Sequence, residues 1–152
     1  SGDWEFRRVL FRSLFKFVKA ILSDKEIDIY NFGKMERDFT YVEDLVIAIS
    51  KLIGCLPERS IAEFDSISPV APFRIVNIGN SEKIKLINFI ESIENSLGLK
   101  ARKNFMEIQP GDVPATWADT KLLKALTGYE PKTDYEYGIQ KFVDWYRSYY
   151  NE

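Results

Sequence analysis

Residues 27–44 read Ile-Asp-Ile-Tyr-Asn-Phe-Gly-Lys-Met-Glu-Arg-Asp-Phe-Thr-Tyr-Val-Glu-Asp. The first four residues alternate apolar and polar side chains, a pattern that predicts a short strand with one buried face. Residues 31–36 contain Gly33, so we expect a turn there. This stretch therefore predicts a strand that leads into a tight turn.

The end of the same stretch predicts the start of a helix. Thr40 and Glu43 have the Thr-x-x-Glu spacing of a capping box, in which each side chain bonds a free backbone N–H of the first turn. We expect the helix to begin near Tyr41 and to end at Gly54, because glycine readily takes the left-handed conformation that closes a helix.

Towards the N-terminus, residues 14–22 place apolar side chains at the i, i+3, i+4 and i+7 positions of an amphipathic helix. Residues 1–13 alternate bulky apolar residues with arginines and follow no single period. We interpret them as an anomalous, non-native segment that resembles translated adapter sequence; the alternative is an exposed helix or strand that continues into Leu14. The domain assignment is accordingly 1–13 for this segment and 14–152 for one folded domain.

Towards the C-terminus, three prolines predict a loop over residues 57–72, and the β-branched residues of 73–78 predict a buried strand. Apolar residues from Ile84 to Leu97 recur at helical spacing up to a stop at Gly98. Later elements are a strand within 101–108, an irregular segment over 109–114, a helix capped by Asp119 that ends at Gly128, and a final helix opened by a second capping box, Thr133 with Glu136. Short strands among more numerous helices indicate a mixed α/β (α+β) fold, with a small sheet and flanking helices.

Composition limits the classes of function. The 152 residues carry 21 basic and 23 acidic side chains, and this balance gives no electrostatic reason to expect nucleic acid or an anionic membrane as a partner. Histidine is absent, which excludes histidine-based triads and removes the commonest zinc ligand, so we expect no metal site. One cysteine, no membrane-length apolar run and no secretory signal pattern favour a cytoplasmic protein.

Two segments could carry binding chemistry. Arg37 stands just before the predicted helix start, where a guanidinium beside the helix N-terminus suits a phosphate. The alternative is that Arg37 and Asp38 pair with each other or with neighbours at the surface. Residues 109–119 form a stiff Gly-Asp loop that could hold the Asp112 carboxylate against sugar hydroxyls; the alternative is a structural turn in which Asp112 and Asp119 only cap. No Gly-x-Gly-x-x-Gly or Walker-type loop is present, and the Tyr137-Lys141 spacing is interpreted as a chance match in the last helix.

Several motifs together resemble one known family. Their order and spacing are similar to those of the extended short-chain dehydrogenase/reductase family, and within it to UDP-glucuronate 4-epimerases. The motifs that carry this resemblance are residues 14–17, 27–44, 76–80, 109–119 and 138–150.

The resemblance implies the C-terminal, substrate-binding lobe of a Rossmann-type, NAD-dependent nucleotide-sugar epimerase. In such enzymes a tyrosine removes the proton of the sugar 4-hydroxyl while hydride passes to NAD, and the hydride returns to the other face of the keto sugar. The glycine-rich loop and the catalytic Tyr and Lys belong to the N-terminal part, so we expect that this chain lacks the cofactor domain, does not bind NAD and is inactive alone.

The resemblance also implies roles for individual residues. Asp28 and Tyr30 would lie near the uracil of a UDP-sugar, Arg37 would bind its diphosphate, and Asp112 would lie near the ribose. Gln109 takes the place of an arginine found in galactose epimerases, which weakens a second phosphate contact. The full-length enzyme is expected to form a homodimer. The alternatives are a fragment of a nucleotide-sugar 4,6-dehydratase and a non-catalytic binding module.

Overall fold

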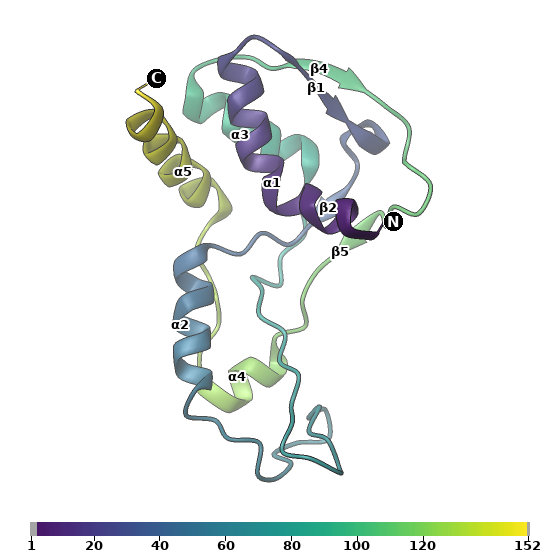
Figure 1. The fold of residues 1–152 in the computed structure, drawn as a ribbon, viewed down its shortest axis with the longest axis vertical. Helices are drawn as coiled ribbons and strands as arrows, with labels where there is room; N and C mark the ends of the chain where they lie inside the picture. Colours follow the sequence, from purple (N-terminus) through teal and green to yellow (C-terminus); the bar gives the residue numbers. More distant parts are fainter. Residues whose placement is uncertain (1–2, 152) are drawn as a thin grey trace. The chain divides into compact units, whose positions relative to one another are not determined.

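The structure is a computed structural model that describes the backbone of residues 3–151 and the side chains of residues 13–151. The chain divides into two compact units, each assembled from segments that are distant in sequence (Figure 1). Unit 1 comprises Ser1–Glu36, Lys85–Pro114 and Glu136–Glu152, and unit 2 comprises Arg37–Ile84 and Ala115–Tyr135.

Unit 1 is built on a parallel pair of strands, β1 (Glu26–Ile29) and β4 (Arg102–Phe105). The predicted alternation in β1 is confirmed, because Ile27 and Ile29 are buried while Glu26 and Asp28 are exposed. The two isoleucines pack against Ile90 at the centre of the unit. The helices of this unit are α1 (Asp3–Leu22), α3 (Leu86–Leu97) and α5 (Tyr135–Tyr150).

The helix predicted over 14–22 is part of α1, which begins at Asp3. No proline or glycine interrupts the chain between Asp3 and Leu22, so the backbone can stay helical although the side chains follow no regular period. The interpretation of 1–13 as non-native is not tested by this helix and stays a prediction. Residues 1 and 2 lie outside the described residues, as do the side chains up to residue 12.

The turn after β1 is tighter than its sequence suggests. Asn31, Phe32 and Gly33 all have positive φ angles, of 50°, 50° and 77°, within the short helix η1 (Tyr30–Gly33). Asn31 and Phe32 are not glycine, so their left-handed backbone conformation is unfavourable by itself. It persists only because contacts with the surrounding structure hold it. The Phe32 N–H donates to the carbonyl of Met106, which lies just beyond the end of β4, at 3.0 Å.

The predicted helix of residues 84–97 is confirmed as α3, and Gly98 closes it with a left-handed φ of 70°. Near its end, Glu94 is buried and accepts hydrogen bonds from the Ala101 N–H at 2.8 Å and from Lys103 Nζ. Burial raises the pKa of Glu94, but these bonds and a further one from Lys100 outweigh it and hold the pKa below its ordinary value. The carboxylate thus joins α3 to β4.

Unit 2 contains α2 (Val42–Leu52) and α4 (Lys121–Thr127), which pack against each other. The capping box predicted at Thr40 and Glu43 is wrong, because the N-cap is Tyr41, with no side-chain cap hydrogen bond. Thr40 lies one position too early for its hydroxyl to occupy the cap position.

The start of α4 differs slightly from the prediction. Its N-cap is Thr120, although the Asp119 carboxylate accepts a hydrogen bond from the Lys121 N–H at 3.1 Å. Gly128 closes the helix with a φ of 68°, as expected. The irregular segment 109–114 is also confirmed.

The buried strand predicted over 73–78 is wrong. The segment is extended but forms no strand, and Phe73 and Ile75 are 57% and 61% exposed. Its backbone bonds to its own preceding loop, where Ser68 N–H donates to the Phe73 carbonyl and Ile75 N–H donates to Ser66 Oγ. β-branched residues favour an extended backbone, but a strand also needs a neighbouring strand with which to pair.

Three two-residue strands, β2 (Glu36–Arg37), β3 (Ile84–Lys85) and β5 (Ala115–Thr116), pair in the order β3-β2-β5. They lie where the chain passes from one unit to the other. Together these elements confirm a mixed α/β fold with small sheets and flanking helices. Within the described residues, no helix combines the length and apolar character needed to cross a membrane.

Candidate functional site

The candidate site of unit 2 is organised by Asp38, which directly follows β2. Its Oδ1 accepts a hydrogen bond from the Asn80 N–H at 3.0 Å. Its Oδ2 accepts two more, from the N–H groups of Ser81 at 2.9 Å and Ala118 at 3.0 Å. The Asp38 N–H in turn donates to the Thr116 carbonyl. One carboxylate therefore holds together three segments that are far apart in sequence.

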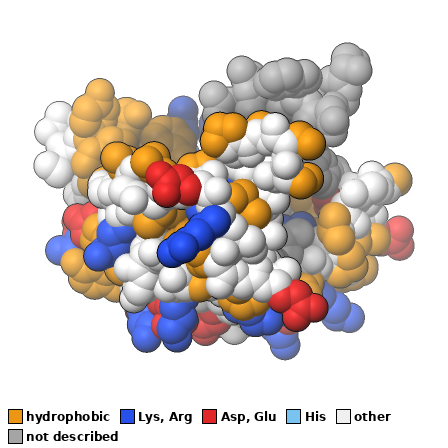
Figure 2. Space-filling model, turned by 90° about the horizontal axis from the view of Figure 1, so that it is seen from below, with side chains coloured by type: hydrophobic (Ala, Val, Ile, Leu, Met, Phe, Trp, Pro, Cys, Tyr) orange, Lys and Arg blue, Asp and Glu red, His pale blue; other side chains and the backbone are white. Residues whose placement is uncertain are grey.

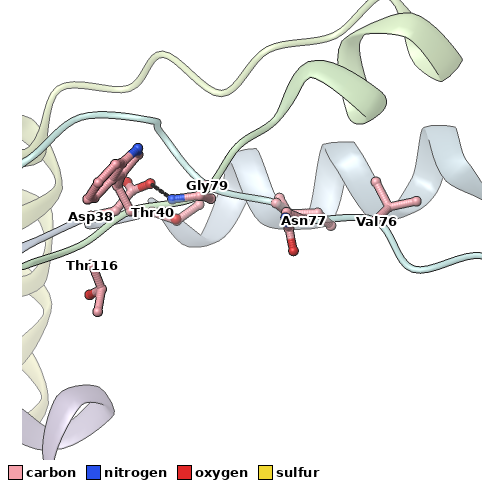
Figure 3. Close-up of a pocket in the computed structure, with 9 residues that line it drawn as sticks. Asp38, Thr40, Val76, Asn77, Gly79 and Thr116 are labelled. Atoms are coloured by element: carbon pink, nitrogen blue, oxygen red, sulfur yellow. Dashed lines mark hydrogen bonds between the residues drawn. The ribbon is translucent and has the colours of Figure 1, made fainter. Parts of the chain in front are cut away.

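These segments border an open cleft of about 440 Å³. Figure 3 shows Asp38 beside Gly79, with Asn77 and Val76 further along the same extended segment. The approach at Gly79 is close: a Cβ there would lie 2.5 Å from Ala118 Cβ and 2.7 Å from Asp38 Oδ2. Glycine is required at this position because a side chain has no room. The remaining lining residues are Thr40, Ile78, Thr116, Trp117 and Ala118.

The cleft lining combines hydrogen-bonding groups with one exposed aromatic ring. Thr40 and Thr116 bring hydroxyl groups and Asn77 brings an amide, each able to donate and to accept. Trp117 is half exposed, and Lys83 Nζ lies 3.5 Å from the centre of its ring. This chemistry suits a polar organic ligand with hydroxyl groups rather than a metal. Among the described residues, no group of three or more Cys, Asp or Glu side chains is placed to hold a metal ion.

A second carboxylate of unit 2 is structural. Asp44 of α2 is 7% exposed and accepts hydrogen bonds from Tyr129 Oη at 2.6 Å and from the Thr133 N–H at 3.0 Å. Burial raises the pKa of Asp44, but these bonds outweigh it and hold the pKa below its ordinary value. Burial and the bond to Asp44 raise the pKa of Tyr129 to about 12. The pair ties α2 to the segment that follows α4.

The four predicted binding residues fall in different parts of the chain. Arg37 is half-buried in β2 and belongs to unit 2, directly beside Asp38 in sequence. Asp28, Tyr30 and Asp112 belong to unit 1. Asp28 lies on β1 and accepts a hydrogen bond from Asn104 Nδ2 of β4 at 2.8 Å. Their roles toward a ligand stay predictions.

The loop of Asp112 adopts a turn of the kind that the sequence suggests. The Asp112 N–H donates to the Gln109 carbonyl at 3.0 Å, and Gly111 has a φ of 90°. The half-buried Asp112 and the half-buried Tyr30 of η1 thus lie on segments with irregular backbone.

Sequence reasoning missed the role of Asp38 and the cleft around it. From the sequence, Asp38 was considered only as a pairing partner of Arg37 or of surface neighbours. In the structure its carboxylate accepts hydrogen bonds from the backbone N–H groups of residues 80, 81 and 118. Gly79 within residues 77–80 was a signal that another part of the chain lies close to the backbone there. The spacing of residues along the chain cannot show which carboxylate binds to this backbone.

Known proteins define the class. No protein-family model matches the sequence. The chain is 49% identical over 144 residues to Protein CapI of Staphylococcus aureus, with 92% of this chain and 43% of that protein covered. It is 44% identical over 143 residues to the probable UDP-glucuronate 4-epimerase of Rhizobium meliloti, with 91% of this chain and 42% of that protein covered. The chain therefore spans less than half the length of the curated relatives it matches.

Solved structures agree with the curated relatives. The crystal structure of UDP-glucuronic acid 4-epimerase from Bacillus cereus in complex with UDP-glucuronic acid and NAD superposes with a TM-score of 0.72 at 26% identity, covering 90% of this chain and 40% of that one. The fold is that of the C-terminal part of a Rossmann-type nucleotide-sugar epimerase. The chain belongs to the extended short-chain dehydrogenase/reductase family, in which its relatives are UDP-glucuronate 4-epimerases.

The residues of this chain do not fit an NAD site. Such a site needs a glycine-rich turn between a strand and a helix, whose N–H groups hold the pyrophosphate. The eight glycines form no Gly-x-Gly-x-x-Gly pattern, and β1 leads into η1 and β2 rather than into an α-helix. The described residues therefore provide no glycine-rich turn that could hold a pyrophosphate.

Proposed function

We propose that this chain is the substrate-binding portion of an NAD-dependent epimerase that interconverts UDP-glucuronate and UDP-galacturonate at C4 of the sugar. The observation that carries the proposal is the 44% identity, over 91% of the chain, to a probable UDP-glucuronate 4-epimerase. The cleft supports it, because hydroxyl, amide and aromatic groups converge where a sugar could bind.

The binding roles follow from the resemblance and from the chemistry of each side chain. Arg37 would hold the diphosphate, because guanidinium and phosphate form paired charge-assisted hydrogen bonds. Asp28 and Tyr30 would contact the uracil, and Asp112 would accept hydrogen bonds from the ribose hydroxyls. The carboxylate of Asp28 is exposed on β1 and already oriented by Asn104, which is consistent with such a role.

The exposed apolar surface of unit 2 supports a role within a longer protein. Helix α2 packs Ala48 inward, yet Val46, Ile49 and Ile53 remain 55%, 48% and 75% exposed. Several exposed apolar side chains on one helix normally mark a surface that another part of a protein covers. Figure 2 views the chain from the end with α4 and the loop after α2, and hydrophobic side chains are spread over that face. Other exposed apolar residues of unit 2 are Val42, Ile47, Leu56, Ile61, Phe64, Val70, Phe73 and Ile75.

We propose that the N-terminal part of the full-length enzyme covers this surface and brings the NAD site with the catalytic Tyr and Lys. Exposed apolar area of this extent marks an interface. The complete enzyme would act in the cytoplasm as a homodimer, without nucleic acid or membrane as a partner. In that enzyme NAD supplies hydride transfer, while the residues of this chain bind and orient the UDP-sugar.

Activity tests the first part of the proposal. The purified 152-residue chain, supplied with NAD and UDP-glucuronate, should form no UDP-galacturonate, because it lacks the cofactor cradle and the catalytic pair. Chromatography of the nucleotide sugars measures this. Joining the chain to the N-terminal part of its relative from Rhizobium meliloti should restore product formation. Turnover by the chain alone, or a different product from the joined enzyme, would contradict the proposal.

Calorimetric titration with UDP tests the binding role of Arg37. Arg37→Ala should weaken binding by about 1.5–3 kcal/mol, the contribution of a charge-assisted hydrogen bond. Arg102→Ala is a matched control, since Arg102 is an exposed arginine of β4 whose contacts are to Asp24, at 3.3 Å to the carbonyl and 4.0 Å to the carboxylate. Equal losses in the two variants, or no UDP binding by the wild-type chain, would contradict a phosphate site at Arg37.

A further inference from the structure

The Asp38 carboxylate uses both oxygens as acceptors. Oδ1 takes one backbone N–H, from Asn80, and Oδ2 takes two, from Ser81 and Ala118. A carboxylate fits this arrangement because it accepts at both oxygens and donates at neither. An amide of the same shape would place an NH₂ group against at least one of these N–H donors in either orientation, so charge and shape are both required.

The three donors lie on two segments that border the cleft. Asn80 and Ser81 follow Gly79, and Ala118 follows Trp117; both Gly79 and Trp117 line the cleft. Further bonds join the same segments, because Ser81 Oγ donates to the Ala118 carbonyl and Asn77 Nδ2 donates to the Asp119 carbonyl. These bonds fix the two segments to each other. The Asp38 carboxylate joins both of them to the end of β2, in addition to the backbone pairing of β2 with β3 and β5.

Arg37, the proposed diphosphate ligand, is the last residue of β2 and directly precedes Asp38. The Asp38 N–H donates to the Thr116 carbonyl at 3.1 Å, so the backbone that carries Arg37 is bonded to the segment that carries Trp117. A side chain held in position before binding loses less freedom when its ligand arrives, which raises affinity without a new contact.

We propose that Asp38 is a positioning residue for UDP-sugar binding. Its carboxylate holds residues 79–81 and 117–118 against the end of β2, and this holds the cleft lining and the backbone of Arg37 in the geometry that binds the ligand. The proposal rests on the proposed function, but the hydrogen-bond network can be tested without any ligand.

The first experiment follows amide hydrogen exchange of the chain by NMR. In Asp38→Asn, the amides of Asn80, Ser81 and Ala118 should exchange at least about tenfold faster, while the amides of α2 and α4 keep their wild-type rates. A general loss of folding would accelerate every amide of unit 2 equally. Asp119→Asn is the matched control: it makes the same charge change in the neighbouring segment and keeps an acceptor for the Lys121 N–H. Unchanged exchange at residues 80, 81 and 118 would overturn the proposal.

The second experiment measures UDP affinity in a double-mutant cycle. Asp38→Asn should weaken binding about tenfold or more. The loss in the double variant with Arg37→Ala should be smaller than the sum of the two single losses, because part of the effect of Asp38 acts through the placement of Arg37. Affinity within twofold of wild type in Asp38→Asn, or losses that add in the double variant, would overturn the positioning role.

The two experiments separate the positioning role from the proposed function. If the wild-type chain does not bind UDP, the proposed function of this chain fails, and the exchange rates still decide whether Asp38 holds the segments. If UDP binds and depends on Arg37 but not on Asp38, the proposed function stands and the positioning role is overturned.

Discussion

Asp44 and Tyr129 show how one residue pair can make stability depend on pH. Tyr129→Phe removes the 2.6 Å hydrogen bond to a buried carboxylate and should lower the free energy of unfolding at neutral pH by about 1.5–3 kcal/mol. Urea denaturation measures this loss. A loss below about 0.5 kcal/mol would show that solvent or the remaining donors replace the hydroxyl.

The sign of the pH dependence follows from the pKa directions of the pair. The pKa of Asp44 is lowered in the folded protein, so its contribution is present above its unfolded pKa and is lost as pH falls through the folded value. The pKa of Tyr129 is raised from 10.0 to about 12, so its contribution is present below pH 10 and is lost as pH rises towards 12. Denaturation at both extremes should therefore show a smaller difference between wild type and Tyr129→Phe than at neutral pH. A constant difference would contradict the coupling.

Gly79 should tolerate no side chain. Gly79→Ala places a Cβ 2.5 Å from Ala118 Cβ, closer than real Cβ contacts allow, so the segments held by Asp38 must move apart. We expect a loss of about 1–3 kcal/mol in the free energy of unfolding, the usual cost of overpacking. Gly54→Ala is the control, because its nearest neighbour, the Lys51 carbonyl, would lie at 3.9 Å. Chemical denaturation of both variants compares them, and equal effects would contradict the close approach at Gly79.

At the scale of elements, Glu94 joins α3 to β4 through two unequal lysines. Lys103 lies 2.8 Å from Glu94 and its side chain is 22% exposed, whereas Lys100 lies at 3.1 Å and is 79% exposed. Lys103→Ala should cost about 1.5–3 kcal/mol, because it removes a charge-assisted bond to a buried carboxylate. Lys100→Ala should cost at most about 1 kcal/mol, as for an exposed ion pair.

Urea denaturation of the two lysine variants provides the comparison. The pKa of Glu94 is held below its ordinary value of 4.5, so its stabilisation is present above that pH and is lost as pH falls through the folded pKa. The difference in free energy of unfolding between Lys103→Ala and Lys100→Ala should therefore become smaller at acid pH. Equal costs for both lysines at neutral pH would show that burial does not decide the strength of these pairs.

Elements whose spacing of apolar residues and whose terminating residue are both visible in the sequence were predicted correctly. Helix α3 has apolar residues at helical spacing and a closing Gly98, so both its course and its end follow from the sequence. The segment 73–78 has an equally clear strand composition but no strand beside it in the described chain. Local preference sets the backbone conformation, whereas strand formation depends on a partner that the segment itself does not supply.

At the scale of the whole molecule, the two units differ in how much apolar surface they bury. Unit 1 buries a continuous set of large side chains, among them Ile29, Ile90 and Val143, each fully buried. Unit 2 buries Leu122 and Leu123 but leaves most of the apolar side chains of α2 exposed. Because burial of apolar area is the main source of stability, unit 2 should be the less stable unit in the isolated chain.

Hydrogen exchange of the isolated chain checks this difference. Amides in the middle of α3 should exchange about tenfold or more slowly than amides in the middle of α2, since local opening is easier where few apolar contacts hold an element. In the full-length enzyme the amides of α2 should become as protected as those of α3. Equal protection of α2 and α3 in the isolated chain would contradict the proposed missing cover.

Local sequence determined the strand pattern of β1, the course of α3, the irregular Gly-Asp loop of Asp112 and, through several ordered motifs, the family. These features depend on residues close together in the chain, or on similarity to known chains. The tertiary structure alone decided that the Asp38 carboxylate meets the N–H groups of Asn80, Ser81 and Ala118. These hydrogen bonds join residues some forty and eighty positions apart. Any carboxylate of the chain has the chemistry to accept them, and only the folded structure decides which one lies beside these donors.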